Sequence, residues 1–81
     1  MKVDLQKIKQ QRKQKKLSQS DMARVLGFNT VYPYHRKESG NQPFTAEELH
    51  KIASFFDLNI EYFFTEEVAK NAIKNNKKEV I

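Results

Sequence analysis

The stretch of sequence that decides the fold runs from residue 17 to residue 40 and reads LSQSDMARVLGFNTVYPYHRKESG. It opens with Ser18 and Asp21 in the S-x-x-D form of a capping box, which predicts the start of a helix. The inner face of that helix is apolar and consists of Met22, Ala23 and Leu26. Gly27 then supplies the left-handed residue at which helices commonly end.

A second helix should follow from about Thr30 to Ser39. Pro33 lies inside this segment, and proline is tolerated only in the first turn of a helix because it lacks an N–H group. We therefore expect Thr30 to be the N-cap and Pro33 to occupy the third helical position. Gly40 ends the helix, and residues 41–43 (Asn-Gln-Pro) form a turn.

On the N-terminal side of this stretch, the spacing predicts a helix from about Asp4 to Lys15. Asp4 is a suitable N-cap, and Leu5 and Ile8 lie three residues apart on one face. Arg12 comes four residues further on and places a charge on that same face.

On the C-terminal side, residues 45–48 (Thr-Ala-Glu-Glu) form a full capping box, with Phe44 placed to contact Leu49 as a hydrophobic staple. The core face of this helix consists of Leu49, Ile52, Ala53 and Phe56. Asn59 can cap a short fifth helix. That helix carries Tyr62, Phe63 and Phe64.

The 81 residues suffice for one domain with a modest core. No alternating apolar and polar run indicates a strand, so we expect an all-α fold. This would be a compact five-helix domain over residues 1–65, followed by a tail over residues 66–81 that can itself be helical. Cysteine is absent, and no apolar run approaches the roughly 20 residues of a membrane span. Residues 1–10 also lack the apolar region of a signal peptide, so we expect a cytoplasmic protein without membrane association.

The net charge of +5 is unevenly distributed. Residues 1–43 carry ten Lys and Arg against three Asp and Glu, whereas residues 44–69 carry one Lys against six acidic side chains. A polyanion would be attracted to the first half and repelled by the middle. On charge alone two interpretations stay open, a nucleic-acid surface and an ordinary solvated helix face.

A short helix, a tight turn and a second helix form a unit that can enter the major groove of DNA. The unit needs a small residue where the helices approach, a glycine in the turn and an apolar residue that fixes the crossing angle. Ala23, Gly27 and Tyr34 can fill these roles. The outer face of the second helix then supplies the candidates for reading bases, which are Val31, Tyr32, His35 and Arg36. The alternative is a solvent-exposed face.

Several short segments share their pattern with a known family. They are Leu17-Ser18-Gln19, Asp21-Met22-Ala23, Leu26-Gly27, Lys37-Glu38-Ser39-Gly40, Pro43-Phe44-Thr45, Ile52-Ala53, Leu58-Asn59-Ile60 and Phe63-Phe64. Over roughly residues 4–64 the chain resembles the repressor and Cro type of helix-turn-helix protein, also called the xenobiotic-response-element-like (XRE-like) family. The resemblance implies a lambda-repressor-like fold, and the variant is most similar to small regulators of phages and mobile elements. Two departures are one extra residue in the turn at Phe28-Asn29, and Lys16 where many members have glycine.

The resemblance also implies roles for individual residues. Arg12 and Glu38 occupy positions that form an ion pair between the first helix and the end of the recognition helix; the alternative is two independent surface charges. Gln19 stands where the family contacts DNA. Similar candidates for contacts to the phosphate backbone are Lys37, Asn41 and Gln42.

The sequence offers little for metal or catalytic chemistry. His35 and His50 are the only histidines and no cysteine accompanies them, so we expect no metal and no cofactor. Ser18 and Ser20 are explained by capping, and no phosphate-cradling loop is present. We do not expect an enzyme, because a core of this size can hardly enclose a pocket.

Two functions are therefore compatible with the sequence. The first is a transcription regulator, a repressor or Cro-like switch, that binds double-stranded DNA as a homodimer. The second is a protein-binding module, such as an antitoxin or a modulator that pairs with another repressor. The candidate dimer or partner contacts are Phe63, Phe64, Val68 and Ile73. The basic first half favours DNA, and the aromatic cluster favours a protein partner.

Overall fold

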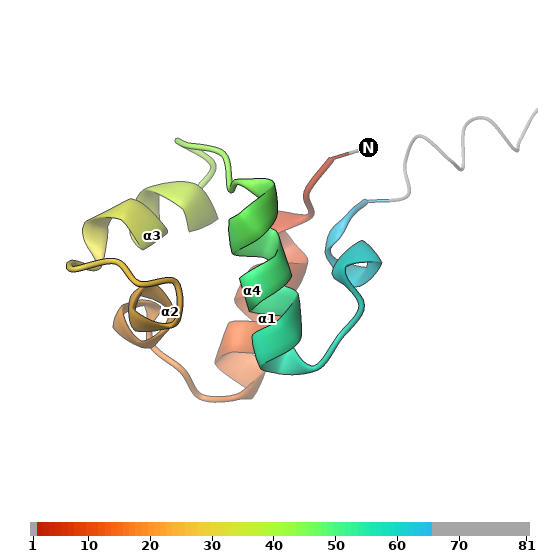
Figure 1. The fold of residues 1–81 in the computed structure, drawn as a ribbon, viewed down its shortest axis with the longest axis horizontal. Coiled ribbons are helices and arrows are strands. Elements are labelled where there is room, and N and C mark those ends of the chain that lie inside the picture. Colours follow the sequence, from red (N-terminus) through yellow and green to blue (C-terminus); the bar gives the residue numbers. More distant parts are fainter. Residues whose placement is uncertain (1, 66–81) are drawn as a thin grey trace, which may run out of the picture.

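The computed structural model describes residues 2–65, which form four α-helices and one 3-10 turn (Figure 1). In chain order these are α1 (Leu5–Gln14), α2 (Gln19–Val25), α3 (Tyr32–Glu38), α4 (Ala46–Phe56) and η1 (Ile60–Phe63). The expected all-α fold class is confirmed. The expected fifth α-helix is wrong, because the chain after Asn59 makes only the 3-10 turn η1 and Phe64 is already extended.

Side-chain caps begin three of the four α-helices at the residues that the sequence predicts. The Asp4 carboxylate accepts hydrogen bonds from two backbone N–H groups of α1, at 3.1 and 3.4 Å. Ser18 and Asp21 form a reciprocal capping box at the start of α2, and Thr45 and Glu48 form another at the start of α4. These caps satisfy N–H groups that have no acceptor within their own helix, so the signal is local in sequence.

α3 begins one residue later than the sequence predicts. Its N-cap is Val31 rather than Thr30, and Pro33 occupies the second helical position rather than the third. Val31 has helical backbone angles (φ −76°, ψ −19°), so the chain enters α3 without the extended conformation that a threonine cap normally has. Pro33 sacrifices no hydrogen bond, because the first N–H groups of a helix lack intrahelical acceptors.

Each of the four α-helices is followed within two residues by a residue in the left-handed region. These residues are Lys16, Gly27, Gly40 and Asp57, with φ values of 60°, 81°, 90° and 59°. In each case the N–H of this residue and the N–H of the next turn back onto the last turn of the helix, as in a Schellman motif. Glycine adopts this conformation freely, whereas the Cβ of Lys16 makes it unfavourable.

The core gathers side chains from all of these elements. Its largest fully buried members are Tyr34, Phe63, Ile8, Met22 and Ile52. Phe44 and Leu49, the expected hydrophobic staple, both lie in the same core. The rings of Tyr34 and Phe44 meet edge to face with centroids 5.9 Å apart, which joins α3 to the segment that leads into α4.

α2 and α3 lie together on one side of the molecule, and η1 lies on the other side against α1 and α4 (Figure 1). The N-terminal segment is tied to η1, since Asp4 N–H donates to the Phe63 carbonyl at 2.7 Å. An isolated antiparallel bridge joins Val3 to Phe64. Both ends of the described chain are therefore held away from α2 and α3. Within residues 2–65, no helix has the length and apolar character needed to cross a membrane.

Candidate nucleic-acid interface

α3 has two faces with different surroundings. The inner face consists of Tyr34, Lys37 and Glu38, which are 0, 6 and 7% exposed. The outer face consists of Tyr32, His35, Arg36 and Ser39, at the i, i+3, i+4 and i+7 positions that share one side of a helix. We call these four residues the outer stripe. Tyr32 is 61% exposed and Val31, just before it, is 39% exposed.

The Glu38 carboxylate is the centre of the inner face. Arg12 of α1 forms a two-point ion pair with it, from Nε to Oε2 at 2.8 Å and from Nη2 to Oε1 at 3.2 Å. Gln19 of α2 donates from Nε2 to Oε1 at 2.7 Å, and the Tyr34 hydroxyl donates to Oε2 at 2.8 Å. Each carboxylate oxygen accepts two hydrogen bonds, so the acceptor capacity of the group is filled. α1, α2 and α3 are joined at this one buried group.

These contacts shift the pKa values of the groups that make them. Burial by itself would raise the pKa of Glu38, but hydrogen bonds from its three partners outweigh burial and hold the pKa below its ordinary value. The hydrogen bond to Glu38 raises the pKa of Arg12. Burial raises the pKa of the Tyr34 hydroxyl, and the Glu38 charge raises it further. At neutral pH the carboxylate is therefore charged and the phenol is a neutral donor.

Gln19 links this buried carboxylate to the outer stripe. Its Nε2 faces Glu38, and its Oε1 lies 3.2 Å from Nδ1 of His35. The Gln19 side chain is half-buried, whereas His35 is exposed. Gln19, which the resemblance marks as a DNA contact, thus engages both ends of its amide within the protein.

Tyr32 and Arg36 form a pair one helical turn apart on the outer stripe. The Arg36 guanidinium lies 5.6 Å from the centroid of the Tyr32 ring, and its Nη1 donates to the Tyr32 hydroxyl oxygen at 3.3 Å. An exposed cation–π contact stabilises by only about 0.5–1 kcal/mol, so a stronger hydrogen-bond acceptor can replace Tyr32 as the partner of Arg36. The pair presents a cation and a phenol at one place on the stripe.

Lys37 lies on the inner face rather than where it can reach a phosphate, which corrects the expectation from sequence. Its Nζ forms an ion pair with Glu48 at 2.6 Å and lies 5.4 Å from the centroid of the Phe28 ring. The Lys37 side chain is 8% exposed. Its position three residues after Tyr34 puts it on the buried side of α3, and the ion pair ties α3 to the capping box of α4.

The turn after α3 presents Asn41 and Gln42, which are both exposed. Their backbone N–H groups turn back to the Arg36 carbonyl, at 2.9 and 3.3 Å. The Asn41 side chain donates to the hydroxyl of Ser39 at 3.3 Å. The two amide side chains therefore lie beside the C-terminal end of the outer stripe, on a backbone fixed by hydrogen bonds.

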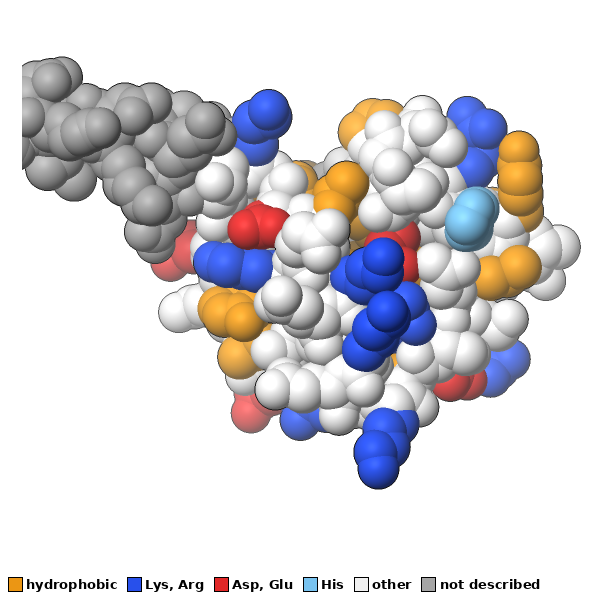
Figure 2. Space-filling model, turned by 180° about the vertical axis from the view of Figure 1, so that it is seen from behind, with side chains coloured by type: hydrophobic (Ala, Val, Ile, Leu, Met, Phe, Trp, Pro, Cys, Tyr) orange, Lys and Arg blue, Asp and Glu red, His pale blue; other side chains and the backbone are white. Residues whose placement is uncertain are grey.

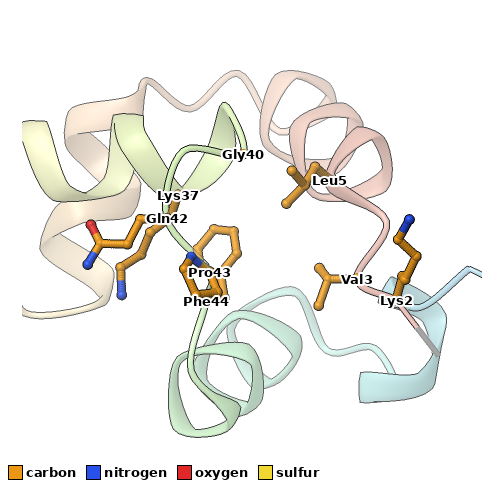
Figure 3. Close-up of a pocket in the computed structure, with 8 residues that line it drawn as sticks. All are labelled: Lys2, Val3, Leu5, Lys37, Gly40, Gln42, Pro43 and Phe44. Carbon is orange, nitrogen blue, oxygen red and sulfur yellow. The ribbon is translucent and has the colours of Figure 1, made fainter.

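A groove of about 310 Å³ separates this turn from the N-terminal segment (Figure 3). Val3 and Leu5 lie on one side of it, and Pro43 and Phe44 lie on the other (Figure 3). Lys2, Lys37, Gly40 and Gln42 complete the lining, so the groove walls hold no carboxylate, imidazole or hydroxyl side chain. The groove thus offers apolar and basic surface rather than general acid–base chemistry.

Exposed basic side chains lie on α1, on α2 and on the connection between them. Figure 2 shows Lys and Arg side chains gathered over α1, with a histidine and hydrophobic groups on the side that carries α2 and α3. The exposed cations of α1, α2 and their connection include Lys13, Lys15, Lys16 and Arg24. Arg24 is engaged with Asp21 on α2, so the lysines at the end of α1 are the more available charges.

The expected dimer or partner residues are not all at the surface. Phe63 is 0% exposed, because the 3-10 turn directs it into the core, and this corrects its assignment to a contact surface. Phe64 is half-buried beside Val3. Val68 and Ile73 lie outside the described residues. Away from the outer stripe, exposed aromatic surface is supplied by Phe55 of α4 and Tyr62 of η1, at 47 and 37% exposure.

Two features of the site were not predicted from the sequence. The Tyr34 hydroxyl bonds Glu38 one helical turn later, a pairing that the i, i+4 spacing could have suggested. The contact between Gln19 and Glu38 joins residues 19 positions apart and has no local signal. Among residues 2–65, no three His, Cys, Asp or Glu side chains come together to hold a metal ion.

A comparison with family models matches the helix-turn-helix family over residues 8–63, more than half of the chain. The matched range includes α2, α3 and the turn between them, together with Arg12 and Glu38. No curated protein sequence and no solved structure matches the chain.

Proposed function

The chain belongs to the helix-turn-helix family of the XRE type, and from that premise we propose that it binds a specific double-stranded DNA sequence as a homodimer with α3 in the major groove. The family indicates a DNA-binding regulator of transcription. In our proposal the protein acts as a repressor or Cro-like switch at a nearby promoter.

The observation that carries this proposal is the contrast between the two faces of α3. The inner face is fixed by two ion pairs, one to α1 and one to the start of α4. The side chains of the outer stripe make two hydrogen bonds to other parts of the described domain, one between His35 and Gln19 and one between Ser39 and Asn41. A helix that reads base edges has to be held rigidly from behind and left open in front, and α3 meets both conditions.

The side chains of the outer stripe and of the residues beside it suit different kinds of contact with DNA. Arg36 can donate two hydrogen bonds to guanine, and Val31 can pack on a thymine methyl group. Tyr32 can donate to a base or a phosphate. Asn41 and Gln42 would set the register by contacting phosphates beside the C-terminal end of α3. Gln19 uses one amide N–H on Glu38 and keeps its second for a phosphate.

Dimerisation would supply the affinity that one small module lacks. A pair of modules contacts two half-sites about one helical turn apart, which doubles the interface. We place the dimer contact on the exposed aromatic surface of Phe55 and Tyr62. The same observation supports the second candidate function, in which this surface binds another protein, such as a toxin or a second repressor.

Selection of bound duplexes from a random-sequence pool tests the proposal. Enrichment of an inverted repeat is the expected result, and binding without any enrichment would contradict sequence-specific reading by the stripe. Arg36→Ala should weaken binding to the selected site by about 1–3 kcal/mol and relax the preference at one base pair. Lys51→Ala, an exposed cation on α4, is the matched control and should leave that preference unchanged.

A further inference from the structure

The hydrogen-bond chain from Glu38 through Gln19 to His35 fixes the chemistry that His35 presents at the surface. A charged carboxylate only accepts hydrogen bonds, so the group of Gln19 that faces Glu38 at 2.7 Å has to be the NH2 end. The other end of the amide is a carbonyl, which also only accepts. The neighbour of that carbonyl at 3.2 Å is Nδ1 of His35, which therefore has to carry the proton.

A neutral imidazole holds one proton on its two nitrogens. With the proton on Nδ1, the Nε2 atom across the ring is an acceptor. His35 is exposed and makes no other side-chain hydrogen bond within residues 2–65. The buried carboxylate of one helix thus sets the polarity of an exposed atom on the outer stripe, with Gln19 of another helix as the connection.

We propose that Gln19 is a positioning residue that holds His35 in the Nδ1–H form, so that His35 Nε2 accepts a hydrogen bond from an exocyclic amine in the major groove. This inference rests on the proposed function, DNA binding through α3. In the major groove only adenine N6 and cytosine N4 offer amine donors, whereas guanine and thymine present acceptors. His35 should therefore favour adenine or cytosine at the base it contacts and disfavour guanine and thymine.

The free protein gives the first test, independent of any DNA. Two-bond proton–nitrogen NMR spectra recorded at about pH 8 report which ring nitrogen of a neutral imidazole carries the proton. His35 should show the Nδ1–H form in the wild-type protein. In the Gln19→Met variant, which removes the amide at similar size, the proton distribution of His35 should move toward that of His50, an exposed histidine on α4. Gln14→Met, an exposed glutamine on α1, is the matched control and should leave His35 unchanged.

The second test measures the base preference at the DNA position that His35 contacts. The base contacted by His35 is found as the position at which His35→Ala loses discrimination among the four base pairs. The wild-type protein should prefer adenine or cytosine there by about tenfold. An amine of either base donates a hydrogen bond to Nε2 of His35, whereas guanine or thymine leaves this acceptor unpaired. Gln19→Met should lose the discrimination against guanine. In this variant the His35 imidazole can carry its proton on Nε2 and donate it to a guanine acceptor. Thermal unfolding of each variant establishes that it is folded in the assay.

Three results would overturn the proposal: an Nε2–H form of His35 in the wild type, an unchanged His35 spectrum in Gln19→Met, or a wild-type preference for guanine or thymine at the His35 position. Failure of the proposed DNA-binding function would give a different set of results. In that case no duplex is selected, while the NMR spectra of the free protein still report whether Gln19 restrains His35.

Discussion

Replacing Glu38 with glutamine removes the charge at the meeting point of α1, α2 and α3 while keeping the size of the side chain. The wild-type carboxylate accepts four hydrogen bonds, two from Arg12 and one each from Gln19 and Tyr34. A glutamine offers one oxygen, which can accept two of them, and its NH2 group then faces the remaining donors. Glu38→Gln therefore leaves at least one buried donor unsatisfied and the Arg12 cation without its counter-charge.

The magnitude follows from these losses. An unsatisfied buried donor costs about 1–3 kcal/mol, and removal of one partner of a buried ion pair costs about 3–5 kcal/mol in total. Because the two losses overlap, we expect Glu38→Gln to lower the free energy of unfolding by about 3–5 kcal/mol. Small domains have total stabilities of roughly 5–15 kcal/mol, so the variant would be marginal. A change of 1 kcal/mol moves the melting temperature of a domain this size by about 4–8 °C.

Urea and thermal unfolding of the wild type and the variant, followed by circular dichroism, measure this change. Glu61→Gln makes the same chemical change at an exposed position in η1 and should alter the stability by less than about 0.5 kcal/mol. If Glu38→Gln unfolds within about 1 kcal/mol of the wild type, the four hydrogen bonds do not hold the three helices together. The account of a rigidly supported α3 would then be refuted.

Three further predictions concern stability and association. Lys16→Gly should raise the free energy of unfolding by about 0.5–1 kcal/mol in thermal unfolding, because Lys16 has a φ of 60°; destabilisation would contradict the assignment of strain there. The pKa values of Glu38 and Glu48 lie below their ordinary 4.5, so the stability they provide is present above pH 4.5 and lost as pH falls through the lowered values. Urea titrations across this range should show that loss, with a smaller slope in Glu38→Gln. Phe55→Ser should weaken self-association in analytical ultracentrifugation about tenfold or more at unchanged fold, and an unaltered oligomeric state would exclude the α4 surface as the dimer contact.

The elements of this fold could be predicted because their signals are local. Asp4, Ser18 and Thr45 satisfy N–H groups within three residues of themselves, and apolar residues at helical spacing mark the core faces. The predicted start of α3 at Thr30 is one residue too early, because the actual N-cap, Val31, has no side chain that can accept a capping hydrogen bond. The expected fifth helix does not form, because Tyr62 and Phe63 lie in the 3-10 turn η1 and Phe64 pairs with Val3 in an antiparallel bridge.

In the candidate site, too, the sequence predicts the place of some residues and not of others. The positions of Tyr32, His35 and Arg36 on one face follow from helical spacing alone. Lys37 is expected from the sequence to contact a phosphate, but it is buried by an ion pair to Glu48 that joins residues 11 positions apart and so has no local signal. The core position of Phe63 likewise depends on how η1 packs against α1 and α4.

By itself, the sequence determined the starts of α1, α2 and α4, the glycines that follow α2 and α3, the basic first half and the all-α fold class, because each of these depends on neighbours within one or two helical turns. Tertiary structure alone decided which charges are buried and which way Gln19 turns its amide. The burial of Lys37 depends on its ion pair with Glu48. The burial of Arg12 and the direction of the Gln19 amide depend on Glu38, a carboxylate that meets its partners only after three helices have packed. Its four acceptor sites are filled by donors from α1, α2 and α3, and hydrogen bonds of that kind are set by position in space rather than by spacing along the chain.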